Sequence, residues 1–320
     1  MKREVFTLAL GKSLYVEMAL NLARSFRLWN SNTDIAFRLV TDWEGELPAS
    51  LSFVEIQKAS VAELGEGFSS KLKLDRLCRA DRSLFIDADC LCVGSLESVF
   101  ETFEGTPVGV VGRPVTGGEW FGNLDSILPK LGIDSIPKFN GGVYYVKKGG
   151  LATTIFDTSR ALEPRYDEIG LVRLRERPND ELLIALALGE HGVRPVPDDG
   201  GIMADLFSFP ARPEVDVIRG KSRLVNPPLG CADHQSWNPL NEASPRIVHF
   251  LGDSHGYPEY RAEALALRLI DLRLPRSLAW LSGRLFLLWP GRLRRFFKNW
   301  MRPLYRKFLG VRPVKTSDRI

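Results

Sequence analysis

Two aspartates that follow an apolar segment are the residues of this sequence that point most directly to chemistry. The apolar residues 83–86 predict a short strand, and Asp87-Ala88-Asp89 comes directly after them. Residues i and i+2 of an extended chain share a face, so the two carboxylates can converge on one point. Such oxygen ligands suit Mg²⁺ or Mn²⁺, which also bind substrate phosphates. We therefore predict a metal site at Asp87 and Asp89; the alternative is two acids that only solvate a turn.

The segments around this motif alternate between strand and helix patterns. Apolar residues at helical spacing follow the first strand, and the same alternation continues beyond the motif. Such alternation predicts an α/β fold, with a Rossmann-like, mostly parallel sheet and helices on both faces. Ligands of these sheets gather at the carboxyl ends of the strands, where Asp87 and Asp89 would lie. We expect strands at 5–10, 35–40, 51–56, 83–86, 108–111 and 142–146, and helices at 72–77, 151–162 and 180–188.

Four more segments of the chain match, in order, motifs that occur together in one known family. They are Lys71-Leu72-Lys73-Leu74, Phe-Asn-Gly-Gly-Val at 139–143, Asn-Asp-Glu at 179–181 and Ile-Val-His-Phe-Leu-Gly at 247–252. With the Asp-x-Asp motif, they resemble the GT-A glycosyltransferases, particularly glycosyltransferase family 8, which contains glycogenin and the lipopolysaccharide galactosyltransferases. The resemblance spans roughly residues 2–257.

The resemblance implies a ligand set for a metal ion and for a nucleotide-diphosphate sugar. His249 would be the third ligand of Mn²⁺ or Mg²⁺, beside Asp87 and Asp89. An ordinary solvated lysine is the alternative for Lys71, a plain turn for 139–143, and a structural role for His249. The donor would contact Thr7, Ala9, Lys71, Asp87, Ala88, Asn140, Gly141, Gly252 and His255.

Three departures from the family pattern bear on the chemistry. Glu181 stands where some relatives carry Gln near the anomeric carbon, and a carboxylate is a stronger nucleophile than an amide. His255 stands where the family has a lysine that binds the diphosphate. The segment 7–11 lacks the family's aspartate after the first strand, which reads the base and ribose; the expected donor is a UDP-sugar.

Asp180 and Glu181 are the predicted catalytic residues, at the start of an apolar helix. The resemblance places Asp180 against the donor sugar. A second interpretation is that Asn179 caps the helix and the two acids favour its dipole, and both can hold together. The implied reaction is metal-dependent transfer of a hexose to a glycan or lipid-linked acceptor, with retention of anomeric configuration.

The C-terminal segment differs from the rest of the chain in charge. It carries 13 Lys and Arg and one acid from Arg273 onward, against 30 bases and 38 acids before it. We expect a GT-A domain at 1–271 and a basic, aromatic, amphipathic helical tail at 272–320, which Pro290 and Pro303 split into short helices. Such a tail suits an anionic membrane surface, and a helix packed on the domain is the alternative.

The sequence also favours a location and weighs against other classes. Four cysteines without metal spacing indicate reduced thiols, and residues 1–10 do not resemble a signal peptide. We expect a cytoplasmic protein, peripheral on the inner face of the cell membrane, and no nucleic-acid partner. The alternatives are a haloacid-dehalogenase-like phosphatase with Asp87 as nucleophile and Asp198 and Asp199 as later acids, and a non-catalytic sugar-binding protein.

Overall fold

A six-stranded sheet forms the centre of the computed structural model, which describes residues 1–65 and 67–310. The first four strands of the sheet are parallel to their neighbours, and the last two are antiparallel additions. This arrangement confirms the predicted α/β fold. In order across the sheet, the strands are β3 (Val54–Lys58), β2 (Ile35–Thr41), β1 (Arg3–Ala9), β4 (Arg82–Ile86), β9 (Val143–Lys147) and β6 (Val108–Gly109).

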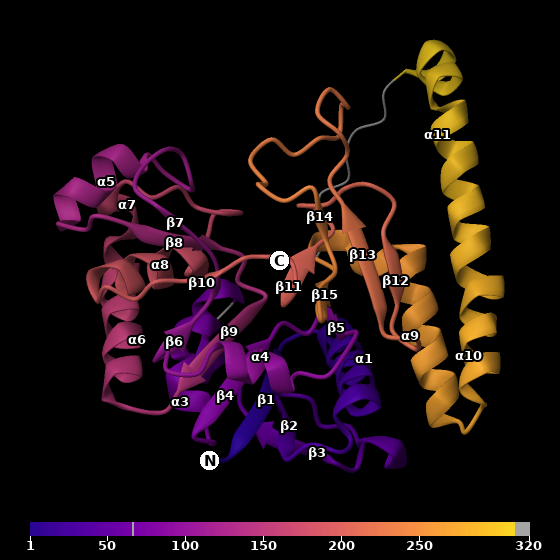
Figure 1. Cartoon of the computed structure of the whole chain (residues 1–320), viewed down its shortest axis with the longest axis horizontal. Coiled ribbons are helices and arrows are strands. Elements are labelled where there is room, and N and C mark those ends of the chain that lie inside the picture. The colour runs from indigo at the N-terminus through magenta and orange to yellow at the C-terminus, as the bar shows by residue number, and fades with distance from the viewer. Residues whose placement is uncertain (66, 311–320) are drawn as a thin grey trace.

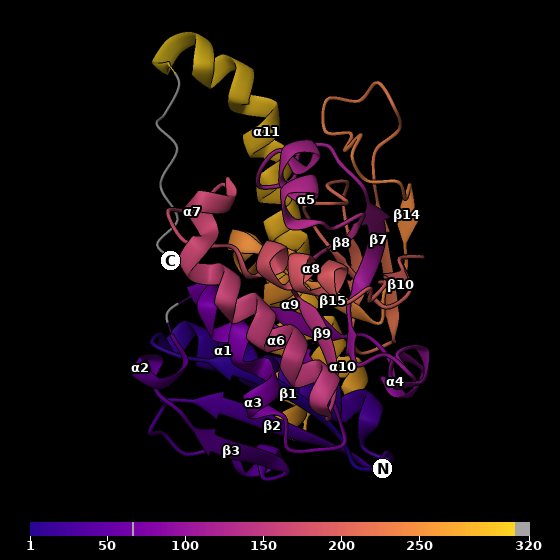
Figure 2. The same ribbon diagram turned by 90° about the vertical axis from the view of Figure 1, so that its left-hand side faces the viewer.

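Helices cover both faces of this sheet (Figures 1 and 2). Val5 and Leu84 point into the core on the α1 side, whereas their neighbours Phe6 and Phe85 point into the core under α6 and α8. Both faces of these strands are therefore apolar, as expected of a parallel sheet that is covered on two sides. These helices and the shorter ones before α9 are α1 (Ser13–Asn30), α2 (Val61–Leu64), α3 (Leu74–Leu77), α4 (Glu97–Thr102), α5 (Leu124–Leu131), α6 (Gly150–Leu162), α7 (Tyr166–Ile169) and α8 (Asp180–Glu190), with 3-10 turns η1 (Ala49–Leu51), η2 (Gly67–Lys73), η3 (Glu163–Arg165) and η4 (Gly252–Gly256).

Three small sheets surround the carboxyl ends of the central strands. Their orders are β10-β7-β8, β11-β15-β5 and β12-β13-β14. In the second of these sheets, β5 directly follows the Asp-x-Asp motif in the chain, because it begins at Cys90. Their strands are β5 (Cys90–Cys92), β7 (Val111–Val115), β8 (Ile136–Phe139), β10 (Val196–Pro197), β11 (Met203–Asp205), β12 (Glu214–Asp216), β13 (Lys221–Val225), β14 (Glu242–Ala243) and β15 (Ile247–His249).

Two predicted strands differ from the observed ones. The expected strand at 51–56 is a 3-10 turn that ends at Leu51, followed by β3, which begins only at Val54. The expected strand at 108–111 is divided between β6 and β7, because β6 pairs with β9 of the central sheet and β7 pairs with β8 of another sheet. A change of sheet within one extended run leaves no signal in the hydrophobic pattern.

The prediction that two prolines split the C-terminal helix is wrong. After α9 (Pro258–Asp271), the residues of α10 (Arg276–Gly283), the π-helical η5 (Arg284–Leu288) and α11 (Trp289–Leu309) form one uninterrupted helical run (Figure 1). Pro290 lies in the first turn of α11, directly after the wider π turn, where the ring is tolerated. Pro303 lies inside α11, and the helix continues past it with one hydrogen bond fewer. Residues 311–320 of the predicted tail lie outside the described residues.

Buried ion pairs join this long helix to α9 and β12. Arg284 is 2.9 Å from Glu263 and 3.2 Å from Asp216, and Arg292 is 2.9 Å from Glu259. Glu259, Glu263 and Arg284 are all buried. A buried charge is strongly destabilising once its partner is removed, so these contacts fix the helix to the domain.

Candidate active site

The side chains of Asp87, Asp89 and His249 meet beyond the carboxyl end of β4. β5 runs antiparallel to β15, and Cys90 pairs with His249 across the two strands. The imidazole Nε2 of His249 is therefore 3.1 Å from Asp89 Oδ1 and 3.8 Å from Asp87 Oδ2. Asp89 and His249 thus lie within reach of one ion, although they are 160 positions apart in the chain, and Asp87 lies beside them with its Oδ2 held by Lys71.

Hydrogen bonds fix the orientation of the imidazole. Nδ1 of His249 is 2.9 Å from Oδ1 of Asn140, an acceptor, so Nδ1 carries a proton and Nε2 faces the two acids. The amide nitrogen of Asn140 donates in turn to Asp205 at 3.2 Å. Asp205 lies opposite His249 in the β11–β15 pair. Sequence reasoning did not select Asp205, because a single acid after two apolar residues has no distinctive spacing.

The donor set fits a hard divalent cation. Burial lowers the pKa of His249, but the carboxylates of Asp89 and Asp87 outweigh it and raise that pKa. The site therefore favours positive charge at this point. The Cys90 sulfur also lies close enough to the ligand atoms of Asp89 and His249 to contact the same ion. Burial, reinforced by Asp89 and Asp87, raises its pKa well above the ordinary value, which favours the neutral thiol. Two carboxylates and one imidazole suit Mn²⁺ or Mg²⁺ better than a soft metal.

Lys71 extends into the site and is not a solvated helix residue. Its Nζ, on η2, donates to Asp87 Oδ2 at 2.7 Å and to the Gly141 carbonyl at 2.9 Å, and lies 4.0 Å from Asp180. Burial would lower the pKa of Lys71, but Asp87 and Asp180 raise it, so the amine remains charged. A fixed cation therefore lies beside the three predicted metal ligands.

The paired glycines allow the backbone to pass close to these side chains. A Cβ on Gly142 would lie 2.6 Å from His249 Nδ1, and a Cβ on Gly141 would lie 2.9 Å from Cγ of Glu181. Both contacts are too short for a larger residue. The Gly-Gly sequence is therefore required by packing within the site, beyond the needs of a turn before β9.

The start of α8 combines capping with placement in the site. Asn179 caps the helix, since its side chain accepts a hydrogen bond from the Glu181 amide at 2.7 Å. Asp180 is buried and accepts a hydrogen bond from the Tyr144 hydroxyl at 2.8 Å. Glu181 accepts one from the Gly141 amide at 2.6 Å. Both interpretations of this segment therefore hold together: the helix is capped, and its two acids lie beside Lys71 and the glycines.

Glu181 makes a pH-dependent contribution to stability. Burial, followed by the charge of Asp180, raises its pKa from 4.5 to about 7. The folded protein therefore binds a proton more tightly than the unfolded chain, and stability falls as pH rises from about 4.5 to 7. In EDTA, we expect Glu181→Gln to gain stability relative to wild type over that interval, by roughly 1–3 kcal/mol for this half-buried side chain.

Urea unfolding at pH 5 and pH 8 measures this difference. Glu168→Gln, at an exposed glutamate of α7, is the matched control and is expected to leave the pH dependence unchanged. A stability difference between Glu181→Gln and wild type that is the same at both pH values would contradict the assignment.

The predicted nucleoside contacts lie at the ends of β1 and β15. Thr7 and Ala9 are fully buried, and the Ala9 carbonyl accepts a hydrogen bond from Thr41. Asp42, which sequence reasoning did not select, lies just beyond β2, and its carboxylate accepts a hydrogen bond from the Gly11 amide at 2.9 Å. The feature that could have selected Asp42 from the sequence is its position at the carboxyl end of a parallel strand. Ala88 is buried between the two aspartates, and Gly252 begins η4 with a left-handed φ of 65°.

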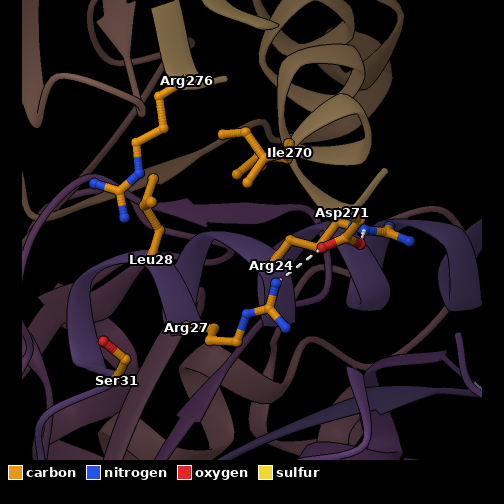
Figure 3. Close-up of a pocket in the computed structure, with 8 residues that line it drawn as sticks. Arg24, Arg27, Leu28, Ser31, Ile270, Asp271 and Arg276 are labelled. Atoms are coloured by element: carbon orange, nitrogen blue, oxygen red, sulfur yellow. Dashed lines mark hydrogen bonds and ion pairs between the residues drawn. The ribbon is translucent and has the colours of Figure 1, made fainter. Parts of the chain in front are cut away.

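Two hollows lie against α1 and α9. One of about 490 Å³ is lined by residues of α1, η4, η5 and α9 and includes His255. The other, of about 200 Å³, lies between α1, α9 and α10, where Arg24 and Arg27 pair with Asp271 (Figure 3). The second hollow is lined by none of the predicted site residues, and Arg24 and Arg27 contact the half-buried carboxylate of Asp271 there.

Comparison with solved structures places this fold among the glycosyltransferases. A crystal structure of the galactosyltransferase LgtC in complex with donor and acceptor sugar analogues matches 88% of this chain and 99% of its own, with a TM-score of 0.53 and 15% identity. The apo-form glycosyltransferase GlyE of Streptococcus pneumoniae TIGR4 matches 88% of this chain and 63% of its own, with 14% identity and a TM-score of 0.49. The apo bifunctional glycosyltransferase WbbM matches 78% and 46%, with 12% identity and a TM-score of 0.48.

Sequence comparison finds no match. No family model matches this chain, and no curated protein matches it significantly. The similarity to LgtC shows the GT-A fold and confirms the resemblance at that level.

Proposed function

We propose that this protein is a metal-dependent glycosyltransferase that moves a hexose from a nucleotide-diphosphate sugar, with UDP as the expected nucleotide. The observation that carries the proposal is the convergence of Asp87, Asp89 and His249 beside Lys71, at the strand ends of a GT-A fold. Two carboxylates and an imidazole would hold Mn²⁺ or Mg²⁺. An ion there supplies positive charge to the diphosphate oxygens of the donor.

The residues around that position suit the departure of a phosphate group. Lys71 is half-buried, charged and held by Asp87 and the Gly141 carbonyl, so its ammonium can stabilise developing negative charge with little reorganisation. His255 would add a weaker, pH-dependent contact. The Asn140 and Gly141 segment would lie against the sugar, while Thr7, Ala9, Ala88 and Gly252 would line the nucleoside and phosphate path.

We infer a same-face route with retention of configuration. The acceptor oxygen forms a bond to the anomeric carbon as the bond to the leaving phosphate oxygen breaks, and the electron pair leaves with that oxygen. The acceptor proton moves to the departing phosphate, so no strong protein base is needed. Asp180 is hydrogen-bonded to Tyr144 and Glu181 to Gly141, which suits electrostatic support of a cationic sugar better than nucleophilic attack. Isolation of a competent glycosyl adduct on either acid would contradict this route.

The rival activities have less support. A haloacid-dehalogenase places its Asp-x-Asp on the first strand, whereas Asp87 follows β4. The acids that would complete such a phosphatase, Asp198 and Asp199, accept hydrogen bonds from the amides of Gly200 and Gly201. A non-catalytic sugar-binding protein would bind sugar without metal-dependent turnover.

A screen of nucleotide sugars tests the proposed activity. We expect the full chain to release nucleoside diphosphate from one donor when Mn²⁺ or Mg²⁺ is present, and at least about 100-fold more slowly in EDTA, because the metal supplies several kcal/mol of charge stabilisation. Release from no donor, or release unaffected by EDTA, would contradict the proposal. Hydrolysis of p-nitrophenyl phosphate in the same preparation would favour the phosphatase.

We further propose that the C-terminal helix binds an anionic membrane surface. One side of the 276–309 run exposes large apolar residues at intervals of three or four, which we call the apolar stripe. The exposed fractions of Phe296, Trp300 and Phe308 are 64%, 64% and 74%. The full stripe is Leu278, Leu281, Leu285, Trp289, Leu293, Phe296, Trp300, Leu304 and Phe308.

Basic residues next to the stripe support the same partner. Arg294, Lys298, Arg302 and Arg306 recur every four residues and are exposed. A helix with one apolar and one basic side lies in the interface of an anionic bilayer, and each base near the surface contributes about 1 kcal/mol. No helix among the described residues has the length and apolarity needed to span a bilayer. Such a protein would transfer sugar to a glycan or lipid-linked acceptor on the cytoplasmic face of the cell membrane.

A further inference from the structure

Two cations face each other across β7 and β8. Arg113 and Lys138 are register partners in this antiparallel pair. Arg113 donates to the Trp237 carbonyl at 3.2 Å, and Nζ of Lys138 lies 5.9 Å from the centre of the Trp120 ring. Within residues 1–65 and 67–310, neither is in an ion pair with an acid. Directly opposed like charges are destabilising, and burial together with Arg113 lowers the pKa of Lys138.

The pair lies close to the candidate active site. Lys138 is two residues before Asn140, so their Cα atoms are within about 7 Å of each other. Lys138 is the second-last residue of β8, and Asn140, whose side chain contacts His249, directly follows that strand. The donor phosphates already have Lys71 and the acidic metal site, so these cations are available to another ligand.

An exposed aromatic pair is connected to the same region. The rings of Phe207 and Trp237 are stacked, with centroids 6.0 Å apart and planes inclined by 26°, yet their exposed fractions are 63% and 42%. Phe207 follows Asp205, whose carboxylate accepts a hydrogen bond from the Phe207 amide at 2.8 Å and one from Asn140. Trp237 lies in the β13–β14 connection, which Arg113 contacts (Figure 1).

Hydrogen bonds hold the aromatic pair in place. Asn238 donates to the Ser208 carbonyl at 2.8 Å, which joins the two segments that carry the rings. The Trp237 indole donates to Gln235 at 2.9 Å, and the Gln235 amide donates to the buried Asn226 at 2.9 Å. Rings fixed in this way present apolar faces without the entropy cost of ordering a loop, and such faces pack well on the C–H groups of a hexose.

We infer that these groups form an acceptor subsite for an acidic glycan. Arg113 and Lys138 bind a carboxylate or phosphate group of the acceptor, and Phe207 and Trp237 stack against one of its sugar rings. A guanidinium binds both oxyanions with paired hydrogen bonds, and a bound anion relieves the repulsion between the two cations. The inference rests on the proposed function, since it takes the ligand to be a glycosyl acceptor.

Binding of simple glycosides to the full chain tests the subsite without turnover. The probes are methyl β-D-glucuronide, glucose 6-phosphate and neutral methyl β-D-glucoside, each titrated in ligand-observed NMR without nucleotide sugar. We expect at least one acidic probe to bind about 10-fold or more tightly than the neutral one. The glucuronide and the phosphate distinguish a carboxylate from a phosphate as the preferred group.

Variants separate the two parts of the subsite. Arg113→Met and Lys138→Met are each expected to remove most of the acidic preference, whereas Trp237→Ala weakens the acidic and neutral probes by similar factors. Lys130→Met, at an exposed lysine of α5, is the control, and circular dichroism reports folding. Equal affinity for acidic and neutral probes, no binding up to 50 mM, or a preference that survives in both cation variants would overturn the inference. Absence of nucleotide-sugar hydrolysis would instead count against the proposed function, because the binding measurement requires no turnover.

Discussion

Replacing Asp89 with Asn is expected to lower sugar transfer by at least about 1,000-fold while the chain remains folded. Asp89 Oδ1 is 3.1 Å from His249, so the carboxylate both binds a cation and sets the charge around the imidazole. An amide keeps the shape and one acceptor oxygen but loses the negative charge. Loss of a correctly bound cation removes several kcal/mol of charge stabilisation, which corresponds to that factor. Asn is preferable to Ala, which would leave Nε2 of the buried imidazole without its partner at 3.1 Å.

Two measurements separate loss of chemistry from loss of fold. Nucleoside diphosphate release from the preferred donor gives the rate, and Mn²⁺ binding by calorimetry is expected to weaken by at least 10-fold, because a carboxylate ligand is lost. Asp134→Asn, at an exposed aspartate beyond α5, is the matched control. Transfer by Asp89→Asn at more than a tenth of the wild-type rate would exclude the metal assignment.

Shortening the chain at two positions is expected to leave its folding intact in one case and to abolish it in the other. A chain that ends at Arg295 keeps the buried pairs of Arg284 and Arg292 and loses most of the exposed part of α11. We expect it to fold and to release nucleotide at the wild-type rate, but to bind anionic vesicles at least about 100-fold more weakly, since Lys298, Arg302, Arg306 and Lys307 are removed.

A chain that ends at Asp271 loses these partners as well. Glu263 and Glu259 are each 1% exposed at the side chain, and they would lose both their arginine partners and the helical run that packs against α9. Removing one partner of a buried pair costs about 3–5 kcal/mol, which is comparable to the whole stability of many domains. We therefore expect this chain to unfold or aggregate, as measured by thermal melting. The division at residue 271 remains a prediction, and a stable, active 1–271 chain would support it.

Vesicle flotation completes this comparison. The full chain is expected to float with vesicles that contain anionic lipid and to remain behind with neutral ones. Equal flotation of the full chain and the chain ending at Arg295 would contradict the membrane proposal, whatever the outcome for activity.

Local patterns predicted the parts of the site that depend on a single segment. The apolar strand before Asp87, the cap at Asn179 and the alternation from β1 to β4 each follow from neighbouring residues. The meeting of Asp87, Asp89 and His249 followed from the family resemblance, since no spacing rule links residues so far apart.

The features that sequence reasoning missed depend on contacts between distant segments. Asp205 gains its place through pairing of β11 with β15, and the Cys90 thiol reaches the site because β5 pairs with β15. The prolines of the C-terminal helix were misjudged for a similar reason. At Pro290 the preceding π turn accommodates the ring, and that turn cannot be read from the proline itself.

The π turn at Arg284–Leu288 also determines which residues of the long helix face α9 and which are exposed. Residues that face α9 recur every four positions, as at Arg284, Leu288 and Arg292. An α-helix over-rotates by about 40° for each step of four, so its inner side would wind away from α9 within a few turns. A π turn has more residues per turn than an α-helix, so it rotates less per residue and reduces the accumulated angle. The π turn thus lets a single helix contact the domain along one side and keep its apolar stripe exposed along the other.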